Sequence, residues 1–145
     1  ITDLSQLLDI YDSFLMISDF ALASNNVGHG IQIIDGDSLL FKNHLAQQGI
    51  YPGTMILEGA LQSAAALIYL KNKNKDRSIL PIIYSINARL IKAVEKQDCI
   101  INHKVHIVKE VETLCEIKVK SYKFSELISN YKFNYAIKPN TPHEK

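Results

Sequence analysis

The most constraining feature of this sequence is a long apolar stretch that contains a single carboxylate. Residues 54–71 have the length and composition of one helix, and their apolar side chains occupy every face of that helix. Such a helix is expected to be buried all round, unlike a surface helix, which is apolar along one stripe. Glu58 lies inside this stretch, and an ionised side chain is costly in apolar surroundings. Either the segment is not buried, or Glu58 has a chemical role.

The second half of the chain is rich in predicted strands. Residues 79–92 form one β-prone run, in which Pro81 suits the start of a strand. Three later segments alternate between apolar and polar positions, and short connections make them antiparallel neighbours. The positions expected to face inward are Ile101, His103, Val105, Ile107, Cys115, Ile117, Val119, Tyr131, Phe133, Tyr135 and Ile137.

The first part of the chain is expected to complete the same sheet. Residues 5–13 can form a short amphipathic helix with Ser5 as its N-cap. Residues 14–24 and 29–36 have the character of strands, separated by a polar turn beside His29, which is interpreted as a turn residue. The predicted fold class is α+β, with an antiparallel sheet wrapped around one long buried helix.

Length and composition are those of one globular domain. The chain has 145 residues, 47% apolar and 21% charged, with a formal net charge of +1. We therefore expect a single domain over residues 1–145 with a polar tail from about 138 to 145. The balanced charge gives no indication of a nucleic-acid partner.

The cysteines and the apolar runs indicate a cytoplasmic protein. Cys99 and Cys115 form no CxxC pair and are expected to be reduced, structural thiols. The first residues lack the basic start and apolar core of a signal peptide. The longest apolar run, residues 64–70, is too short to span a bilayer, so no membrane span is expected.

Four positions share the register of a known motif. His44 is followed eight residues later by Pro52 and Gly53, and then by Glu58 and Gln62. This pattern resembles the signature of the hotdog-fold 3-hydroxyacyl-(acyl-carrier-protein) dehydratases of the FabZ/FabA type, which is roughly H-F-P-G-x-P-x-x-P-G-x-x-x-x-E-A-x-x-Q. Glutamate rather than aspartate at the acid position is similar to the FabZ side of that family.

Two further stretches extend the resemblance over most of the chain. Residues 87–98 resemble the family's A-R-F-(K/R)-x-P-V-x-P-G-D strand and turn, and residues 11–20 resemble its Y-P-F-L-L-V-D-R-V start. Two departures are clear: LAQQG follows His44 in place of F-P-G-x-P, and AVEKQD lacks two prolines and a glycine. They affect the substrate pocket and the rate more than the fold, and would suit a divergent member of a polyketide or aryl-polyene type pathway.

Dehydration of a 3-hydroxyacyl thioester to a trans-2-enoyl thioester needs a base, an acid and a group that stabilises the enolate oxygen. His44 can be the base, and Glu58 can be the acid because burial raises the pKa of a carboxyl group. Gly53 and Thr54 open the helix, and the N–H groups of its first turn can bind the oxygen. Gln62 lies four residues after Glu58 on the same face and can hold its carboxyl.

Each of these residues also has a structural interpretation. His44 could be a loop histidine, Glu58 a carboxyl satisfied by a backbone group or a partner chain, and Gln62 a structural residue. His103 and His106 point to opposite faces of one strand, which argues against a shared metal site. His103 is then expected to be a core histidine with its hydrogen bonds satisfied.

The resemblance also implies partners. In the resembled family, two chains pair through their sheets, and the catalytic histidine and glutamate come from opposite chains. We therefore expect a homodimer or a heterodimer with a homologous chain, acting on acyl groups held on the phosphopantetheine of an acyl carrier protein. No metal or nucleotide cofactor is implied.

Two other functions stay open at the level of the sequence. In a hotdog thioesterase, Glu58 would activate a water molecule instead of protonating a hydroxyl. Alternatively, the altered loop after His44 could mark a subunit of a heterodimeric dehydratase that has little activity of its own.

Overall fold

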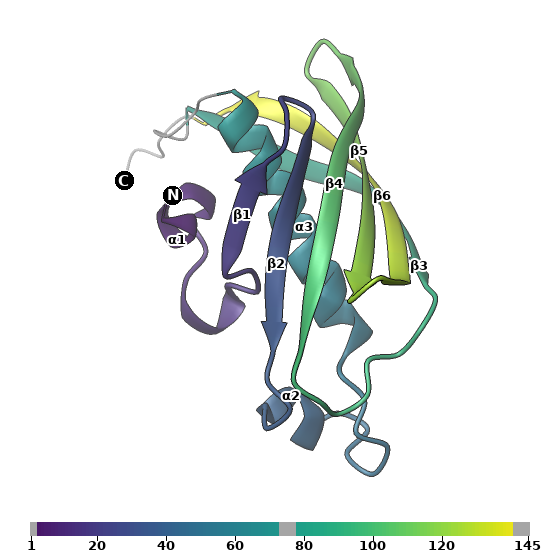
Figure 1. Ribbon diagram of the computed structural model, residues 1–145. Helices are drawn as coiled ribbons and strands as arrows, with labels where there is room; N and C mark the ends of the chain where they lie inside the picture. The colour runs from purple at the N-terminus through teal and green to yellow at the C-terminus, as the bar shows by residue number, and fades with distance from the viewer. Residues whose placement is uncertain (1–2, 73–77, 141–145) are drawn as a thin grey trace.

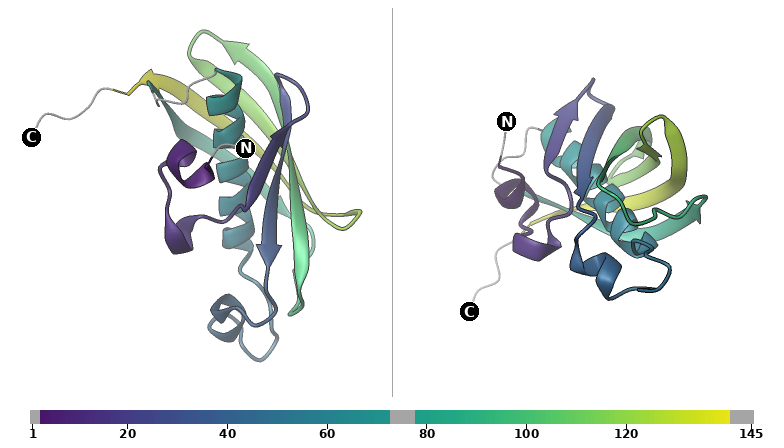
Figure 2. Two further views of the ribbon diagram at one scale, coloured as in Figure 1. Left: turned by 60° about the vertical axis from the view of Figure 1, so that its left-hand side comes forward. Right: turned by 60° about the horizontal axis from the view of Figure 1, so that its bottom comes forward.

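The computed structural model describes residues 3–72 and 78–140. The long apolar segment forms helix α3, Gly53–Lys71, one residue longer at its start than predicted. Most of α3 is buried, and the six-stranded sheet curls around it (Figure 1). The helix is apolar on every face because strands lie on several of its sides, as the two rotated views make plain (Figure 2).

The sheet is antiparallel throughout, with the strand order β1-β2-β4-β5-β6-β3. The α+β class and the sheet wrapped around one helix are therefore confirmed. The strands are β1 Asp19–Leu22, β2 Val27–Ile34, β3 Ile79–Leu90, β4 Cys99–Val111, β5 Leu114–Lys123 and β6 Glu126–Pro139.

The predicted inward positions of β4, β5 and β6 are confirmed. Ten of them are buried and Ile137 is half-buried, because alternate side chains of a strand point to opposite faces of a sheet. Cys99 and Cys115 are both free thiols and both buried. These strands and α3 enclose the larger of two apolar clusters; the smaller lies at the end of the molecule where α3 begins.

Two local predictions near the N-terminus are wrong. The N-cap of helix α1, Leu4–Leu8, is Asp3, whose carboxylate accepts the N–H of Ser5 at 3.0 Å, so Ser5 is not the cap. His29 lies inside β2 and not in the turn, because β2 begins at Val27 and pairs with β4 from there.

Three further elements differ from the expectation. A short helix, α2 (Leu39–Lys42), and a 3-10 turn, η1 (Asp12–Phe14), were not predicted. Strand β6 continues to Pro139, so the start of the predicted tail belongs to the sheet. Residues 141–145 of that tail lie outside the described residues.

Strand β3 is an edge strand with an exposed apolar surface. Ile86 and Leu90 pair with Phe133 and Ser129, which are buried on the side of the sheet that faces α3. Ile86 is nevertheless 46% exposed and Leu90 58% exposed. The inner face of the sheet therefore extends beyond the area that α3 covers.

Helix α3 is long and apolar enough to cross a membrane by length and composition. The sequence prediction considered only the shorter run 64–70 and missed this. More than half of the relevant window of α3 is buried inside the fold, which is the pattern of a core helix.

Candidate active site

Glu58 lies in the second turn of α3 and is half-buried at an apolar cavity of about 500 Å³. Burial raises the pKa of Glu58, and a hydrogen bond with Gln62 partly opposes that rise. Glu58 is the one ionisable side chain among the residues lining the cavity, which are Ser13, Phe14, Met16, Leu40, Thr54, Met55, Leu57, Glu58 and Leu61. Burial therefore acts on the Glu58 pKa in the direction expected from the sequence.

Gln62 is buried and connects Glu58 to the wall of this cavity. Its amide NH₂ donates to the carbonyl of Phe14 at 2.6 Å, and its carbonyl oxygen accepts the N–H of Met16 at 2.8 Å. Phe14 and Met16 both line the cavity. Gln62 therefore fixes the N-terminal segment over the cavity in addition to contacting the Glu58 carboxyl, a double role that the helix spacing alone did not indicate.

His44 lies in the loop after α2 and is half-buried. Its Nδ1 lies 3.1 Å from the carbonyl oxygen of Ile50. A carbonyl oxygen only accepts, so Nδ1 carries the proton and Nε2 keeps its lone pair in the neutral ring. The backbone thus orients His44 with a basic nitrogen on the side away from Ile50.

The loop after His44 closes without the prolines of the resembled motif. Leu45 takes a left-handed conformation with φ of 46°, and its carbonyl accepts the N–H groups of Gln48 and Gly49, both at 2.9 Å. Gly49 also has a positive φ, 63°, which glycine adopts without strain. A hydrogen-bonded turn therefore replaces the rigid residues of the motif.

The loop that follows His44 and the β3–β4 connection, which both belong to the stretches that carry the resemblance, lie side by side at the start of α3 (Figure 1). Tyr51 donates its N–H to the carbonyl of Val94 at 2.9 Å, and Ile50 forms an isolated bridge with Glu95. Val94 is 1% exposed and belongs to the smaller apolar cluster. This pairing holds Ile50, whose carbonyl orients His44, against the β3–β4 connection.

The first turn of α3 begins with two backbone amides that have no acceptor within the helix. The N–H of Met55 donates to the carbonyl of Pro52, whereas the amides of Gly53 and Thr54 precede the first helical acceptors. A Cβ on Gly53 would lie 2.9 Å from Cδ1 of Leu90, so a larger residue here would require the exposed Leu90 side chain to shift. Gly53 lines a second cavity of about 210 Å³, while Thr54 lines the Glu58 cavity.

A buried polar chain beneath this turn was not predicted as a unit. His103 is fully buried, with Nδ1 2.7 Å from the hydroxyl of Ser121 and Nε2 2.8 Å from the carbonyl oxygen of Gln32. The NH₂ of Gln32 donates to the carbonyl of Met55 at 3.2 Å. Burial lowers the pKa of His103 to about 3, so the ring is neutral and the prediction of a satisfied core histidine is confirmed.

Within one chain, the predicted residues fall into two groups. Glu58, Thr54 and Gln62 gather around one cavity, whereas His44 is not among the described residues that line it. Gly53 lies between these groups at the start of the helix. One chain therefore does not bring the predicted base and acid to the same cavity.

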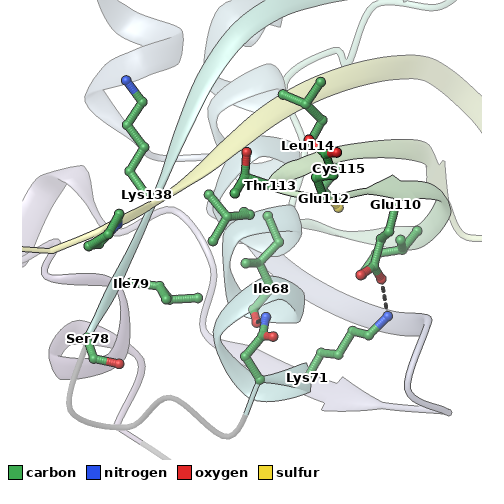
Figure 3. A pocket seen from close by; sticks show the side chains of 14 residues that line it. Ile68, Lys71, Ser78, Ile79, Glu110, Glu112, Thr113, Leu114, Cys115 and Lys138 are labelled. Atoms are coloured by element: carbon green, nitrogen blue, oxygen red, sulfur yellow. Dashed lines mark hydrogen bonds and ion pairs between the residues drawn. The ribbon is translucent and has the colours of Figure 1, made fainter.

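Another cavity, of about 390 Å³, lies at the opposite end of α3, and none of the predicted site residues lines it. Lys71 and Glu110 form an ion pair at its rim (Figure 3). Cys115 lies in its wall, and burial raises the pKa of this thiol to about 11. Cys115 is therefore a poor nucleophile near neutral pH.

No three His, Cys, Asp or Glu side chains converge as a metal site would require, within residues 3–72 and 78–140. His103 and His106 lie on opposite faces of β4, as predicted from their spacing.

Comparison with known proteins gives a consistent family signal. The sequence model of the FabA-like domain family matches residues 11–132. The 3-hydroxyacyl-[acyl-carrier-protein] dehydratase FabZ of Pseudothermotoga lettingae is 20% identical over 140 residues, which are 92% of this chain and 97% of that protein.

Solved structures share the fold at low identity. A chain of the dehydratase heterocomplex ApeI:P from Xenorhabdus doucetiae superposes with a TM-score of 0.75 at 16% identity, covering 97% of this chain and 93% of its own. Cj0977, a sigma28-regulated virulence protein of Campylobacter jejuni, gives 0.69 at 15% identity over 97% and 88%. A hypothetical thioesterase of Streptococcus pneumoniae TIGR4, solved with coenzyme A, gives 0.64 at 13% over 88% and 91%. At these identities the structures show the hotdog fold and nothing more specific.

Proposed function

This chain belongs to the FabA-like family, and from that premise we propose that it dehydrates 3-hydroxyacyl thioesters carried on an acyl carrier protein. The product would be the trans-2-enoyl thioester. The observation that carries the proposal is the Glu58 carboxyl, whose pKa is raised by burial at an apolar cavity of about 500 Å³. A carboxyl with a raised pKa holds its proton to higher pH than an ordinary glutamate and can donate it to a leaving hydroxyl.

The proposed reaction uses two side chains and one helix terminus. Nε2 of His44 takes the proton from the carbon next to the thioester carbonyl, since Nδ1 is occupied by Ile50. Glu58 protonates the departing 3-hydroxyl, which leaves as water while the double bond forms. The first-turn amides of α3, at Gly53 and Thr54, stabilise the negative charge that develops on the thioester oxygen.

The proposal requires a second chain. His44 of one chain does not line its own Glu58 cavity, and β3 offers an uncovered apolar edge that includes Ile86 and Leu90. Pairing of two chains along β3 would cover that edge and could bring His44 of one to Glu58 of the other. We propose that the active form is a dimer of this chain or a heterodimer with a homologous chain.

One comparison favours keeping the heterodimer as a second arrangement. The structure from Xenorhabdus doucetiae is described as a dehydratase heterocomplex. The altered turn after His44 is compatible with a chain that reaches full activity only beside a homologous partner. In that arrangement each chain would contribute one working residue to a shared site.

The test is a dehydration assay of the purified chain with 3-hydroxyacyl groups on a carrier protein. The wild type should remove about 18 Da as water, and His44→Ala and Glu58→Gln should each lose about 10²–10⁴-fold in rate. Glu112→Gln is the matched control, because Glu112 is exposed at the β4–β5 turn and away from the Glu58 cavity. Release of free acid would instead identify a thioesterase. No reaction from the folded wild type would count against a homodimer that is active by itself on these acyl groups, and would direct the assay to other acyl groups and to a homologous partner.

A further inference from the structure

The outer face of the sheet, opposite to α3, carries a continuous band of positive charge. Strand pairing places two neighbouring cross-strand rows on this face. The first row is His29, Lys104, Lys120, Asn130 and Arg89, from β2, β4, β5, β6 and β3. The second row is Val27, His106, Lys118, Lys132 and Asn87, from the same strands in the same order. We call the Lys, Arg and His members of these rows the basic band: His29, Arg89, Lys104, His106, Lys118, Lys120 and Lys132.

The basic band concentrates charge that the chain as a whole does not have. It holds five of the 16 Lys and Arg residues and none of the 15 Asp and Glu residues, so the rest of the chain carries a net charge of −4. The five Lys and Arg side chains are exposed. Within the described part of the chain, one charge of the band is paired with a carboxylate: Nζ of Lys132 lies 3.7 Å from Oε1 of Glu116.

This arrangement is unfavourable for the isolated chain. Lys104 lies directly opposite Lys120, and Lys118 directly opposite Lys132. Like charges directly opposite on neighbouring strands destabilise a sheet, whereas opposite charges stabilise it by roughly 0.2–1 kcal/mol per pair. For folding alone, each of these outer-face positions requires only a polar residue. Lysines alternating with glutamates would therefore have stabilised the sheet more.

We propose that the basic band docks an acidic helix of a partner protein, laid across the strands. Neighbouring strands are about 4.8 Å apart, so the band spans about 19 Å from β2 to β3. A helix rises about 1.5 Å per residue, so about 13 residues cover this length. Carboxylates at i, i+3 and i+4 recur about every 5–6 Å along one helix face, which matches the spacing of the cations.

Other polyanions fit this surface less well. The two rows contain no Phe, Tyr or Trp side chain to serve as a stacking platform for single-stranded bases. They also contain no large apolar side chain that could enter a bilayer, apart from the half-buried Val27 at one end.

The docking surface is separate from the proposed reaction. No residue of the basic band lines the Glu58 cavity or contacts His44. Binding can therefore be measured without substrate, and its outcome does not depend on whether the chain is a dehydratase. Removal of charge from the band should leave dehydration of a small thioester unchanged.

The experiment compares two alanine-based helical peptides of about 16 residues. One carries its glutamates on a single face, and the other carries the same glutamates spread around the helix. We expect the one-faced peptide to bind the chain at low salt and to shift the amide resonances of Lys104, Lys118 and Lys120. The variant Lys118→Gln/Lys120→Gln should bind it about tenfold more weakly.

The matched control is Lys42→Gln/Lys96→Gln, which removes two exposed lysines outside the band and leaves the same net charge. We expect it to bind the one-faced peptide like the wild type. The proposal would be overturned if both double variants bound the one-faced peptide equally weakly, or if the wild type bound the two peptides equally well. It would also be overturned if the wild type bound neither peptide. Tighter band-dependent binding of duplex DNA or of phosphatidylserine vesicles would also overturn it.

Discussion

At the scale of single residues, Glu58 shows how one environment sets both chemistry and stability. Burial raises the pKa of Glu58 above its ordinary value of 4.5. At pH values between the pKa of Glu58 in the unfolded chain and its pKa in the folded chain, the folded chain holds a proton that the unfolded chain has released. The contribution of Glu58 to the free energy of unfolding is therefore fully present below pH 4.5, and it is lost as the pH rises through the Glu58 pKa of the folded state.

We predict that Glu58→Gln abolishes this dependence, because glutamine does not ionise. The difference in Tm, variant minus wild type, should grow as the pH is raised from about 4 to about 8. Thermal unfolding followed by circular dichroism measures it. Glu112→Gln should show no such trend, and parallel curves for Glu58→Gln and the wild type would contradict the prediction.

The buried ring of His103 gives a second prediction at this scale. The NH₂ of Gln32 donates to Met55, so the carbonyl oxygen of Gln32 faces His103 and can only accept. Nε2 of His103 must then carry the ring proton, and Nδ1 accepts from the hydroxyl of Ser121. Nitrogen NMR of the imidazole should show this single tautomer, unchanged from neutral pH down to about pH 4.

The same residue destabilises the fold in acid. Its folded pKa of about 3 lies below the ordinary 6.5, so its contribution to stability is present above pH 6.5 and is lost as the pH falls toward 3. A charged ring at pH 5, or a proton on Nδ1, would show that the hydrogen-bond chain is arranged differently.

At the scale of elements, α3 approaches the sheet closely because small residues face it. A Cβ on Gly59 would lie 2.0 Å from the carbonyl oxygen of Gln32 and 2.7 Å from Nε2 of His103. On β2, a Cβ on Gly30 would lie 1.9 Å from the hydroxyl of Ser63. These glycines permit the polar chain of Gln32 and His103 to reach the first turn of α3.

We predict that Gly59→Ala destabilises the fold by about 1–3 kcal/mol, because the added methyl overpacks this contact. In an exposed helix, the same change would stabilise by up to about 1 kcal/mol, so the sign is diagnostic. Urea unfolding measures the difference. In a Gln32→Ala background the penalty should shrink, because the nearest atom is gone; a full penalty there, or a stabilised Gly59→Ala, would contradict the packing.

At the scale of the whole molecule, the question is whether one site is shared by two chains. His44→Ala and Glu58→Gln each remove one of the proposed groups. When the two variants are unfolded, mixed and refolded together, random pairing should restore about a quarter of the wild-type activity, because half of the dimers then hold one intact site. Each variant treated alone should stay inactive.

Activity of the mixture no higher than that of the separate variants would show that the site is not shared. Ile86→Lys should also abolish the activity, since a charge at the exposed edge of β3 prevents pairing. Ile33→Lys is the matched control, because Ile33 is 62% exposed on a different part of the sheet. Sedimentation analysis reports the oligomeric state of each variant.

The sequence by itself determined the helix, the strands of the second half and the inward positions along them. Those features follow from periodicity, because an all-round apolar helix and alternating strands have few ways to hide their apolar atoms. The register of Glu58 and Gln62 on one helix face also follows from the sequence. The cap at Asp3 does not follow from the sequence, because Asp3 and Ser5 can both cap a helix. The strand position of His29 does not follow either, because a polar turn does not show at which residue strand pairing begins.

Only the tertiary structure decided how the residues of the site are held. The carbonyl of Ile50 orients His44, and Gln62 reaches back to Phe14 and Met16, 48 and 46 residues earlier in the chain. The basic band cannot be seen in the sequence either, because its arginine and four lysines are scattered between residue 89 and residue 132 and meet only through strand register. Backbone acceptors and cross-strand neighbours have no residue signature of their own. They exist only once the strands have paired and the sheet has closed around α3.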